Sequence, residues 1–322
     1  ARVNSLSSKA WHIFELKMVN ADISEKKLKL VGLVLNNKDK PLKERFRALF
    51  CLKNLGGEIA INEIAKCFDD ESALLKHELA YCLGQMKDAR AIPVLVTLLK
   101  NTKLEPVVRH EAGEALGAIG SPDILPVLQE YVGDSTRVVA ETCMLAVDRV
   151  KYLTNNPSVF NSEYTSIDPA PPFDCTNIEE LRSIYLNVEK SLFERYRAMF
   201  SLRNIGSNEA LSALAEGFLD DSALFRHEVA FVLGQVRNVV SIKPLVSRLE
   251  DLQENEMVRH EAAEALGAIG TPETVDILKR FLSDPETIVR ESCEVALDMA
   301  EYEMSCNFQY ADTLSEINKN SV

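Results

Sequence analysis

Apolar and polar positions alternate at helical spacing over most of the chain. In 108–119, apolar residues recur at intervals of three and four, which places them on one face of a helix. The stripe ends at Gly120, where a left-handed helix cap is favoured. Ser121 and Pro122 follow, a helix-capping residue and a residue suited to the first helical turn. The pattern predicts two helices in direct succession, joined at Gly120.

The same pair of helices is predicted again 150 positions later. "VRHEAGEALGAIG" (108–120) returns as "VRHEAAEALGAIG" (258–270), with Gly113 replaced by Ala263 as the only change. Two further segments, 44–57 and 73–86, also match their counterparts at this offset. The chain is therefore a tandem duplication.

Each half also repeats internally. His77 and His110 are 33 positions apart, as are His227 and His260. Aligning the apolar stripes gives four units of about 30–33 residues in each half, eight in all. Helix pairs of this period stack side by side, so the predicted fold is all-α, an α-solenoid in two equivalent halves. The aligned positions lie near Arg45, Lys76, Arg109, Ala140, Arg195, Arg226, Arg259 and Arg290.

A proline-rich segment divides the two halves. We expect an N-terminal half at 1–153, a linker at 154–176, a C-terminal half at 177–302 and a polar, disordered tail at 303–322. The linker holds four prolines among Ser, Asn and Asp residues, a composition typical of connecting segments. A linker of this length would let the second half turn back to face the first.

Composition narrows the class of protein. No apolar run approaches the ~18–20 residues that span a bilayer, so no membrane association is expected. Seven cysteines without a C-x-x-C pair favour reduced thiols and a cytoplasmic protein. The net charge of −13 argues against nucleic acid as a partner. It would suit a cationic target.

Four of the five histidines stand at equivalent places, and a glutamate follows each of them. The first and fourth units of each half carry other residues there, so helix packing does not require the pair. One His-Glu pair on a helix is usually solvated or buried with a partner. Four in register predict a shared role. The pairs are His77-Glu78, His110-Glu111, His227-Glu228 and His260-Glu261.

These residue types favour a metal site. Neutral imidazole and carboxylate bind first-row transition metals. Neighbouring helices pack about 8–10 Å apart, so equivalent side chains on adjacent units can converge on one ion. The absence of cysteine from the pattern argues against structural zinc. Two ions, one per half, or one shared dinuclear centre would fit. Ligand type alone leaves open iron with oxygen chemistry and hydrolysis with manganese or zinc.

The repeated phrase resembles the HEAT-repeat family, whose second helix commonly reads Val-Arg-x-x-Ala-x-x-Ala-Leu-Gly-x-Ile-Gly. With its four dyads, as in "KHELAYCLGQ" and "RHEVAFVLGQ", the chain resembles the deoxyhypusine hydroxylase family. The resemblance implies a non-haem di-iron monooxygenase with two iron ions per chain and O2 as co-substrate. It would hydroxylate the deoxyhypusine side chain of the translation initiation factor 5A precursor to hypusine. An external electron donor would be needed.

The resemblance also implies residue roles. Glu78 and Glu228 would hold the cationic amines of the substrate. Met257 matches a position on the oxygen-binding side of the metals, although plain helix packing explains it equally well. The implied iron ligands are His77, His110 and Glu111 for one ion, and His227, His260 and Glu261 for the other.

Two other functions fit the same pattern. A HEAT-repeat adaptor could use the dyads as polar contacts to a protein partner, and chelators would not affect that binding. Another dinuclear metalloenzyme, such as a hydrolase, would turn over without oxygen. Bilin-lyase-like HEAT proteins share the repeat, but they give no reason for paired dyads in both halves.

Overall fold

The computed structural model describes residues 25–156, 164–305, 311–313 and 317. Over these residues the chain forms sixteen α-helices joined by short 3-10 turns and loops, and no β-strand occurs among them. None of the described helices is both long and apolar enough to cross a bilayer. His12 and most of the predicted tail (303–322) lie outside the described residues, while 303 and 304 belong to the last helix.

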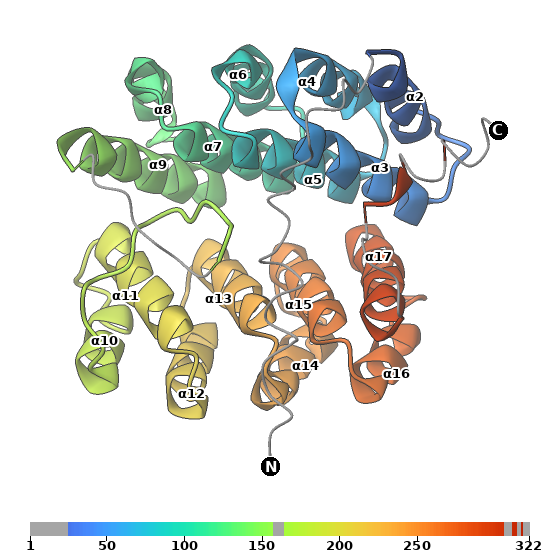
Figure 1. Cartoon of the computed structure of the whole chain (residues 1–322). Coiled ribbons are helices and arrows are strands. Elements are labelled where there is room, and N and C mark those ends of the chain that lie inside the picture. The colour runs from blue at the N-terminus through green and yellow to red at the C-terminus, as the bar shows by residue number, and fades with distance from the viewer. Residues whose placement is uncertain (1–24, 157–163, 306–310, 314–316, 318–322) are drawn as a thin grey trace.

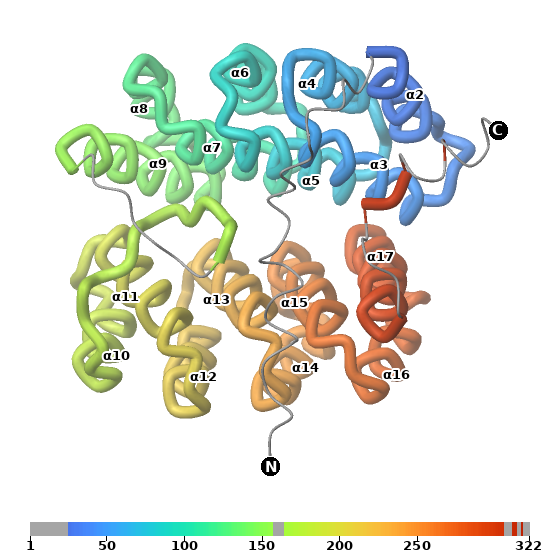
Figure 2. Tube along the Cα trace, viewed as in Figure 1, coloured from blue at the N-terminus to red at the C-terminus, as the bar shows by residue number. Residues whose placement is uncertain are grey.

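The helices form two rows that face each other (Figures 1 and 2). The first row comprises α2 (Glu25–Leu35), α3 (Leu42–Leu55), α4 (Gly57–Ala65), α5 (Ala73–Gln85), α6 (Ile92–Lys100), α7 (Pro106–Ile119), α8 (Leu125–Tyr131) and α9 (Arg137–Asn155). The second comprises α10 (Ile178–Tyr185), α11 (Leu192–Ile205), α12 (Asn208–Glu216), α13 (Ala223–Val236), α14 (Ile242–Glu250), α15 (Glu256–Ile269), α16 (Pro272–Arg280) and α17 (Thr287–Met304).

In each row the even-numbered helices lie on the outside and the odd-numbered helices line the interior (Figure 1). Helices α3, α5, α7 and α9 look across at α17, α15, α13 and α11. The predicted all-helical solenoid is confirmed. The dyads therefore lie on interior helices, because α5, α7, α13 and α15 carry them.

The helix ends follow the predicted chemistry. Gly120 (φ 73°) and Gly270 (φ 63°) are left-handed C-caps, as predicted, and their N–H groups donate to carbonyls one turn back. Thr271 then caps α16 through a reciprocal pair of hydrogen bonds with Thr274. Ser121 makes no side-chain cap, and a 3-10 turn precedes α8 there. The helix junction is thus built differently in the two halves.

Interior helices approach very closely within each row. A Cβ added at Gly84 of α5 would lie 2.7 Å from the Cα of Ala115 on α7. Only glycine therefore permits this spacing, and the small side chain opposite it completes the contact. The close approach sets how near His77 and His110, one on each helix, can come.

Buried arginines fasten each solenoid from within. Arg109 donates its Nε–H to the carbonyl of Leu99, ten residues earlier, and pairs with Asp134 at 2.6 Å. Arg259 does the same with Leu249 and Asp284. Each guanidinium thereby ties an outer helix, an inner helix and the following loop. Arg45 with Asp70 and Arg195 with Asp220 repeat this brace.

Direct bonds join the two halves at both ends of the rows. Ser72 donates to Glu291 at 2.8 Å, and Ser222 donates to Glu141 at 2.5 Å. These two bonds are equivalent by the 150-residue offset. The α3–α17 end has an additional bidentate ion pair, in which Arg47 donates to both carboxylate oxygens of Asp298 at 2.9 and 2.7 Å.

The connecting segment closes the other end. Its described part, 164–176, is non-helical and passes between the rows. Arg203 of α11 binds both carboxylate oxygens of Asp168 at 2.6 and 2.8 Å. Arg149 of α9 donates to the Asp168 carbonyl at 2.8 Å. The backbone N–H of Ile167 donates to Gln85 at 2.9 Å. This segment therefore bonds to both halves.

Candidate metal centre

The four histidines of the dyads meet at the centre of the molecule. Their rings form a closed circuit with centroid distances of 5.6 Å (His77–His110), 5.5 Å (His110–His227), 5.5 Å (His227–His260) and 5.3 Å (His260–His77). None is more than 5% exposed. The two halves thus contribute equally to one buried cluster.

Most of the ring nitrogens of this cluster make no hydrogen bond to the described part of the protein. Both ring nitrogens of His77, His227 and His260, and Nε2 of His110, are buried without a hydrogen bond among the described residues. Buried polar atoms are normally paired, because leaving one unpaired costs roughly 1–3 kcal/mol. Seven orphaned imidazole nitrogens in one cluster are the mark of a site that binds an ion.

The predicted set of the first half is gathered in one place. Glu111 Oε2 lies 3.2 Å from His77 Nε2 and 3.9 Å from His110 Nε2. Two ligand atoms bound at ~2.1 Å and separated by ~100° stand ~3.2 Å apart. The His77–Glu111 spacing matches that of two ligands of one ion, and His110 has a donor atom within 4.8 Å of both.

The predicted set of the second half is partly gathered. His227 Nε2 lies 3.3 Å from Glu261 Oε2, which reproduces the His77–Glu111 contact. His260, however, belongs to two groups of atoms within 4.8 Å of one another, one with His77 and His227 and one with Glu261 and Glu264. The group of His77, His227 and His260 therefore joins the two halves.

A carboxylate that sequence reasoning missed lies beside His260. Glu264 Oε1 stands 3.5 Å from His260 Nδ1 and accepts a hydrogen bond from Ser292 at 3.1 Å. In the first half the atom beside the corresponding nitrogen is a hydroxyl: Thr142 Oγ1 lies 3.4 Å from His110 Nδ1. The available signal was a glutamate four residues after the histidine, one helical turn along the same face.

Burial and nearby charges set the protonation of the imidazoles. Burial acts to lower the pKa of His77, but Glu111 raises it overall to about 9. Burial lowers the pKa of His110 well below its ordinary value, that of His227 to about 3, and that of His260 as well. Three neutral imidazoles thus present lone pairs at neutral pH. At His77 a metal ion would take the place of the proton.

The carboxyl groups are crowded. Burial, with the charge of Glu264, raises the pKa of both Glu78 and Glu261 to about 8. Burial also raises the pKa of Glu114 and Glu228 well above the ordinary value, and neighbouring carboxylates add to the shift. Cations placed among these groups would relieve the repulsion.

The remaining predicted residues flank the cluster. Glu78 and Glu228 are 7% and 2% exposed, and Glu228 Oε1 has no hydrogen-bond partner among the described residues. Met257 is buried in the first turn of α15, one turn before His260. Its role on the oxygen side stays a prediction.

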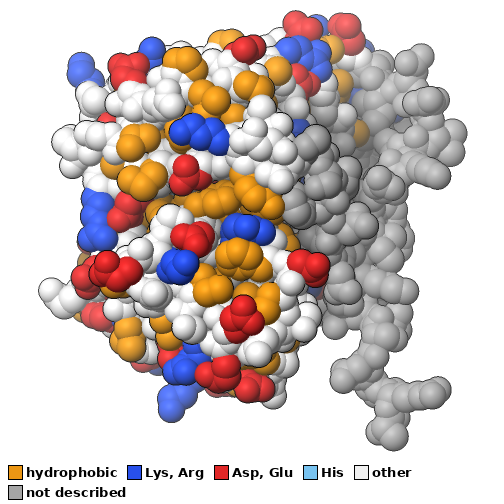
Figure 3. Space-filling view, turned by 90° about the vertical axis from the view of Figure 1, so that its left-hand side faces the viewer, with side chains coloured by type: hydrophobic (Ala, Val, Ile, Leu, Met, Phe, Trp, Pro, Cys, Tyr) orange, Lys and Arg blue, Asp and Glu red, His pale blue; other side chains and the backbone are white. Residues whose placement is uncertain are grey.

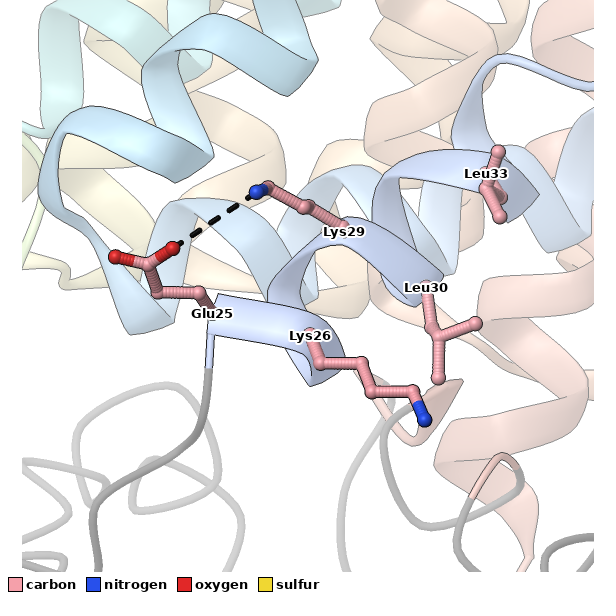
Figure 4. Close-up of a pocket in the computed structure, with 5 residues that line it drawn as sticks. All are labelled: Glu25, Lys26, Lys29, Leu30 and Leu33. Atoms are coloured by element: carbon pink, nitrogen blue, oxygen red, sulfur yellow. Dashed lines mark ion pairs between the residues drawn. The ribbon is translucent and has the colours of Figure 1, made fainter.

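Surface features do not compete with this site. A hollow over α2 is lined by Glu25, Lys26, Lys29, Leu30 and Leu33, with Glu25 and Lys29 paired at 3.8 Å (Figure 4). Among the described residues its lining holds one carboxylate, which is paired with Lys29, and no histidine. The end of the molecule in Figure 3 shows apolar side chains interspersed with both signs of charge and no histidine among the coloured residues.

Comparison with known proteins agrees with this geometry. A family model described as HEAT repeats matches residues 61–148 and 219–298, and one described as PBS lyase HEAT-like repeat matches 194–220. Deoxyhypusine hydroxylase of Drosophila melanogaster is 58% identical over 297 residues, which cover 92% of this chain and 98% of the relative. The chain belongs to the deoxyhypusine hydroxylase family.

Further relatives agree. The human deoxyhypusine hydroxylase is 53% identical over 298 residues, covering 92% of this chain and 98% of that protein. The solved structure of human deoxyhypusine hydroxylase in complex with glycerol matches with a TM-score of 0.85 and 54% identity, over 86% of this chain and 97% of that one. The chain is thus an enzyme of a hydroxylase family, with buried His/Glu groups that can hold metal.

Proposed function

We propose that this chain is an iron-dependent monooxygenase that hydroxylates the deoxyhypusine side chain of the translation initiation factor 5A precursor. Membership of the deoxyhypusine hydroxylase family supports the reaction. The observation that carries the proposal is the buried circuit of four imidazoles with orphaned nitrogens, ringed by carboxylates from both halves. An adaptor would have no use for such atoms in its interior.

Two iron ions per chain would occupy the cluster, one on His77, His110 and Glu111 and the other on His227, His260 and Glu261. Imidazole and carboxylate donors without cysteine suit iron that reacts with oxygen. When bound, the iron supplies the chemistry by which O2, two electrons and two protons turn a C–H bond into C–OH and release one water. An external donor, acting in the cytoplasm, provides the electrons. Among the described cysteines, five are free thiols, which suits a reducing compartment: Cys67, Cys82, Cys143, Cys175 and Cys293.

The protein's own groups would prepare the site in three ways. Burial keeps three imidazoles neutral and excludes bulk water from the reacting atoms. Glu78 and Glu228 would ionise as the amines of the substrate bind and would pair with them. The net charge of −13 draws a basic protein loop towards the enzyme. Met257 would border the side from which oxygen arrives.

One assay separates this function from its alternatives. The purified, iron-loaded chain is incubated with the factor 5A precursor carrying deoxyhypusine, a chemical reductant and O2. Mass spectrometry should show one oxygen atom added to the deoxyhypusine residue, and the addition should stop without O2 or after chelation.

Other outcomes would point elsewhere. Turnover that persists without O2 would identify a different dinuclear enzyme. Binding of the precursor that chelation leaves unchanged, with no product at two irons per chain, would identify an adaptor and overturn the proposal.

A further inference from the structure

Two pairs of carboxylates lie beside the histidine circuit. The predicted roles account for only one member of each pair. Glu114 of α7 is the carboxylate whose charge acts most strongly on Glu228 of α13. Glu264 of α15 acts in the same way on Glu78 of α5. The pairs are equivalent by the 150-residue offset. If their surroundings were the same, the two pairs would be expected to have the same role.

The pair on the α5–α15 side is already engaged. Glu264 accepts a hydrogen bond from Ser292 at 3.1 Å and lies 3.5 Å from His260 Nδ1. The residue equivalent to Ser292 is Thr142, which instead donates to the carbonyl of Val138 at 2.8 Å. It therefore gives no hydrogen to Glu114.

The pair on the α7–α13 side is free to bind a ligand. Glu228 is 2% exposed, and its Oε1 has no hydrogen-bond partner in the described part of the chain. Unpaired buried carboxylate oxygens are costly. This one therefore indicates a missing donor.

A small cavity between the two described rows is lined by Glu114 of this pair and by Leu224, which lies one helical turn before Glu228 on α13. Its walls include Glu114, Thr142, Arg149 and Tyr196, and Pro169 of the connecting segment closes it. It has room for about one water-sized group, which is also the size of an alkylammonium head. Thr142 separates it from His110, 3.4 Å from the ring. A group held here would place the adjoining methylenes beside the metal ligands.

The charges around the cavity favour a cation. Asp168 and Arg203 form a bidentate ion pair, so their charges cancel. Arg149 brings one positive charge, and its guanidinium donates to two backbone carbonyls. Burial raises the pKa of Glu114 and Glu228, so both would ionise when a cation binds beside them, and they would then bring two negative charges. The balance is one negative charge, which a single ammonium would neutralise.

We propose that Glu114, Glu228 and this cavity form the subsite for the primary ammonium at the end of the substrate's aminobutyl chain. An ammonium has three N–H donors. Glu114, Glu228 and the hydroxyl oxygen of Tyr196, which donates its own hydrogen to the Leu224 carbonyl at 3.3 Å, offer three acceptors. The equivalents of Tyr196 and Arg149 are Phe46 and Met299, so the opposite side offers a less polar setting. The inference rests on the proposed function and adds Glu114 to it.

The test compares Glu114→Gln with its counterpart Glu264→Gln, using the factor 5A precursor carrying deoxyhypusine. Glu114→Gln keeps the shape of the side chain and removes its charge. Its KM should rise about tenfold or more, because the hydrogen bond to the ammonium loses the carboxylate's negative charge, while its iron content matches the wild type. Glu264→Gln should lower iron retention and change KM less than about twofold.

A second measurement guards against a folding defect. Two precursor peptides are compared, one with the free terminal amine and one with that amine acetylated. The wild type should strongly prefer the free amine, and Glu114→Gln should lose most of this preference. Tyr196→Phe, which removes one acceptor, should lose a smaller part of it.

The outcomes separate two kinds of failure. If the wild type is active and Glu114→Gln has the same KM and the same amine preference as the wild type, the proposed subsite is wrong and the proposed function stands. Equal rises of KM in Glu114→Gln and Glu264→Gln would also overturn the subsite. If the wild type forms no product with either peptide, the proposed function itself fails.

Discussion

The two halves of the molecule have nearly the same sequence around their dyads, yet they surround them differently. The later histidine of the first half, His110, has the hydroxyl of Thr142 at its Nδ1, whereas His260 has the carboxylate of Glu264 there. A carboxylate partner makes an imidazole a stronger donor to a metal than a hydroxyl does. Duplication therefore copied the candidate ligands but left the later histidine of each half with a different neighbour.

The two ends of the rows differ as well. At the α3–α17 end, Arg47 and Asp298 bridge the halves directly. At the α9–α11 end, Asp168 of the connecting segment stands between Arg149 and Arg203. The first end is an ion pair at a half-buried surface, and the second is a buried junction that also roofs the cavity.

The largest effect should come from removing a proposed ligand in either half. His110→Ala and His260→Ala should each lower hydroxylation by about a hundredfold or more and reduce bound iron, because each leaves an incomplete ligand set. Metal analysis and product mass measure both. Met144→Ala on the exposed face of α9 is the control. Full activity in either histidine variant would show that the two halves do not share one centre.

The two junctions can be compared by removing one carboxylate from each. Asp168→Ala should destabilise the protein by about 3 kcal/mol or more, because Arg203 is completely buried and loses a bidentate partner. Asp298→Ala should cost only about 1 kcal/mol, since the Arg47 side chain is 31% exposed and can reach water. Denaturant unfolding measures both. Equal losses would mean that the connecting segment does not stabilise its end more than the ion pair does.

The single difference within the repeated phrase should have the smallest effect. Gly113→Ala makes the first half match the second at Ala263, and its Cβ would lie 3.3 Å from Cys143 Sγ. Better helix propensity offsets the tight contact, so stability should change by less than about 1 kcal/mol.

Gly117→Ala is the contrasting variant, because its Cβ would come within 2.8 Å of the Cβ of Ala146. It should destabilise the protein by about 1–3 kcal/mol. Thermal unfolding of the two variants distinguishes the cases. If Gly113→Ala lowered the stability as much as Gly117→Ala does, the predicted difference between the two positions would be wrong.

Much of the fold was predictable because its signals are local. Apolar spacing, the glycine caps at Gly120 and Gly270 and the repeat period gave the helices and their stacking. The register of the four dyads pointed to a shared site because equivalent positions of a solenoid line one face.

Other features depend on contacts between distant segments. Glu264 matters because Ser292 and His260 approach it, and Glu114 because a cavity opens beside it. Each lies one helical turn after a dyad histidine, but nothing near it in the chain reveals these contacts. Asp168 reads as one more polar residue of a linker, and only the facing arginines of two helices give it a structural role.

The central claim is that both halves hold one buried dinuclear iron centre. Crystals of the iron-loaded protein, measured at the iron absorption edge, test it most directly. Two anomalous peaks should appear among α5, α7, α13 and α15, within about 4 Å of each other, and each should contact a histidine pair. Iron bound only on the surface, or two peaks too far apart to act on one substrate, would contradict the account.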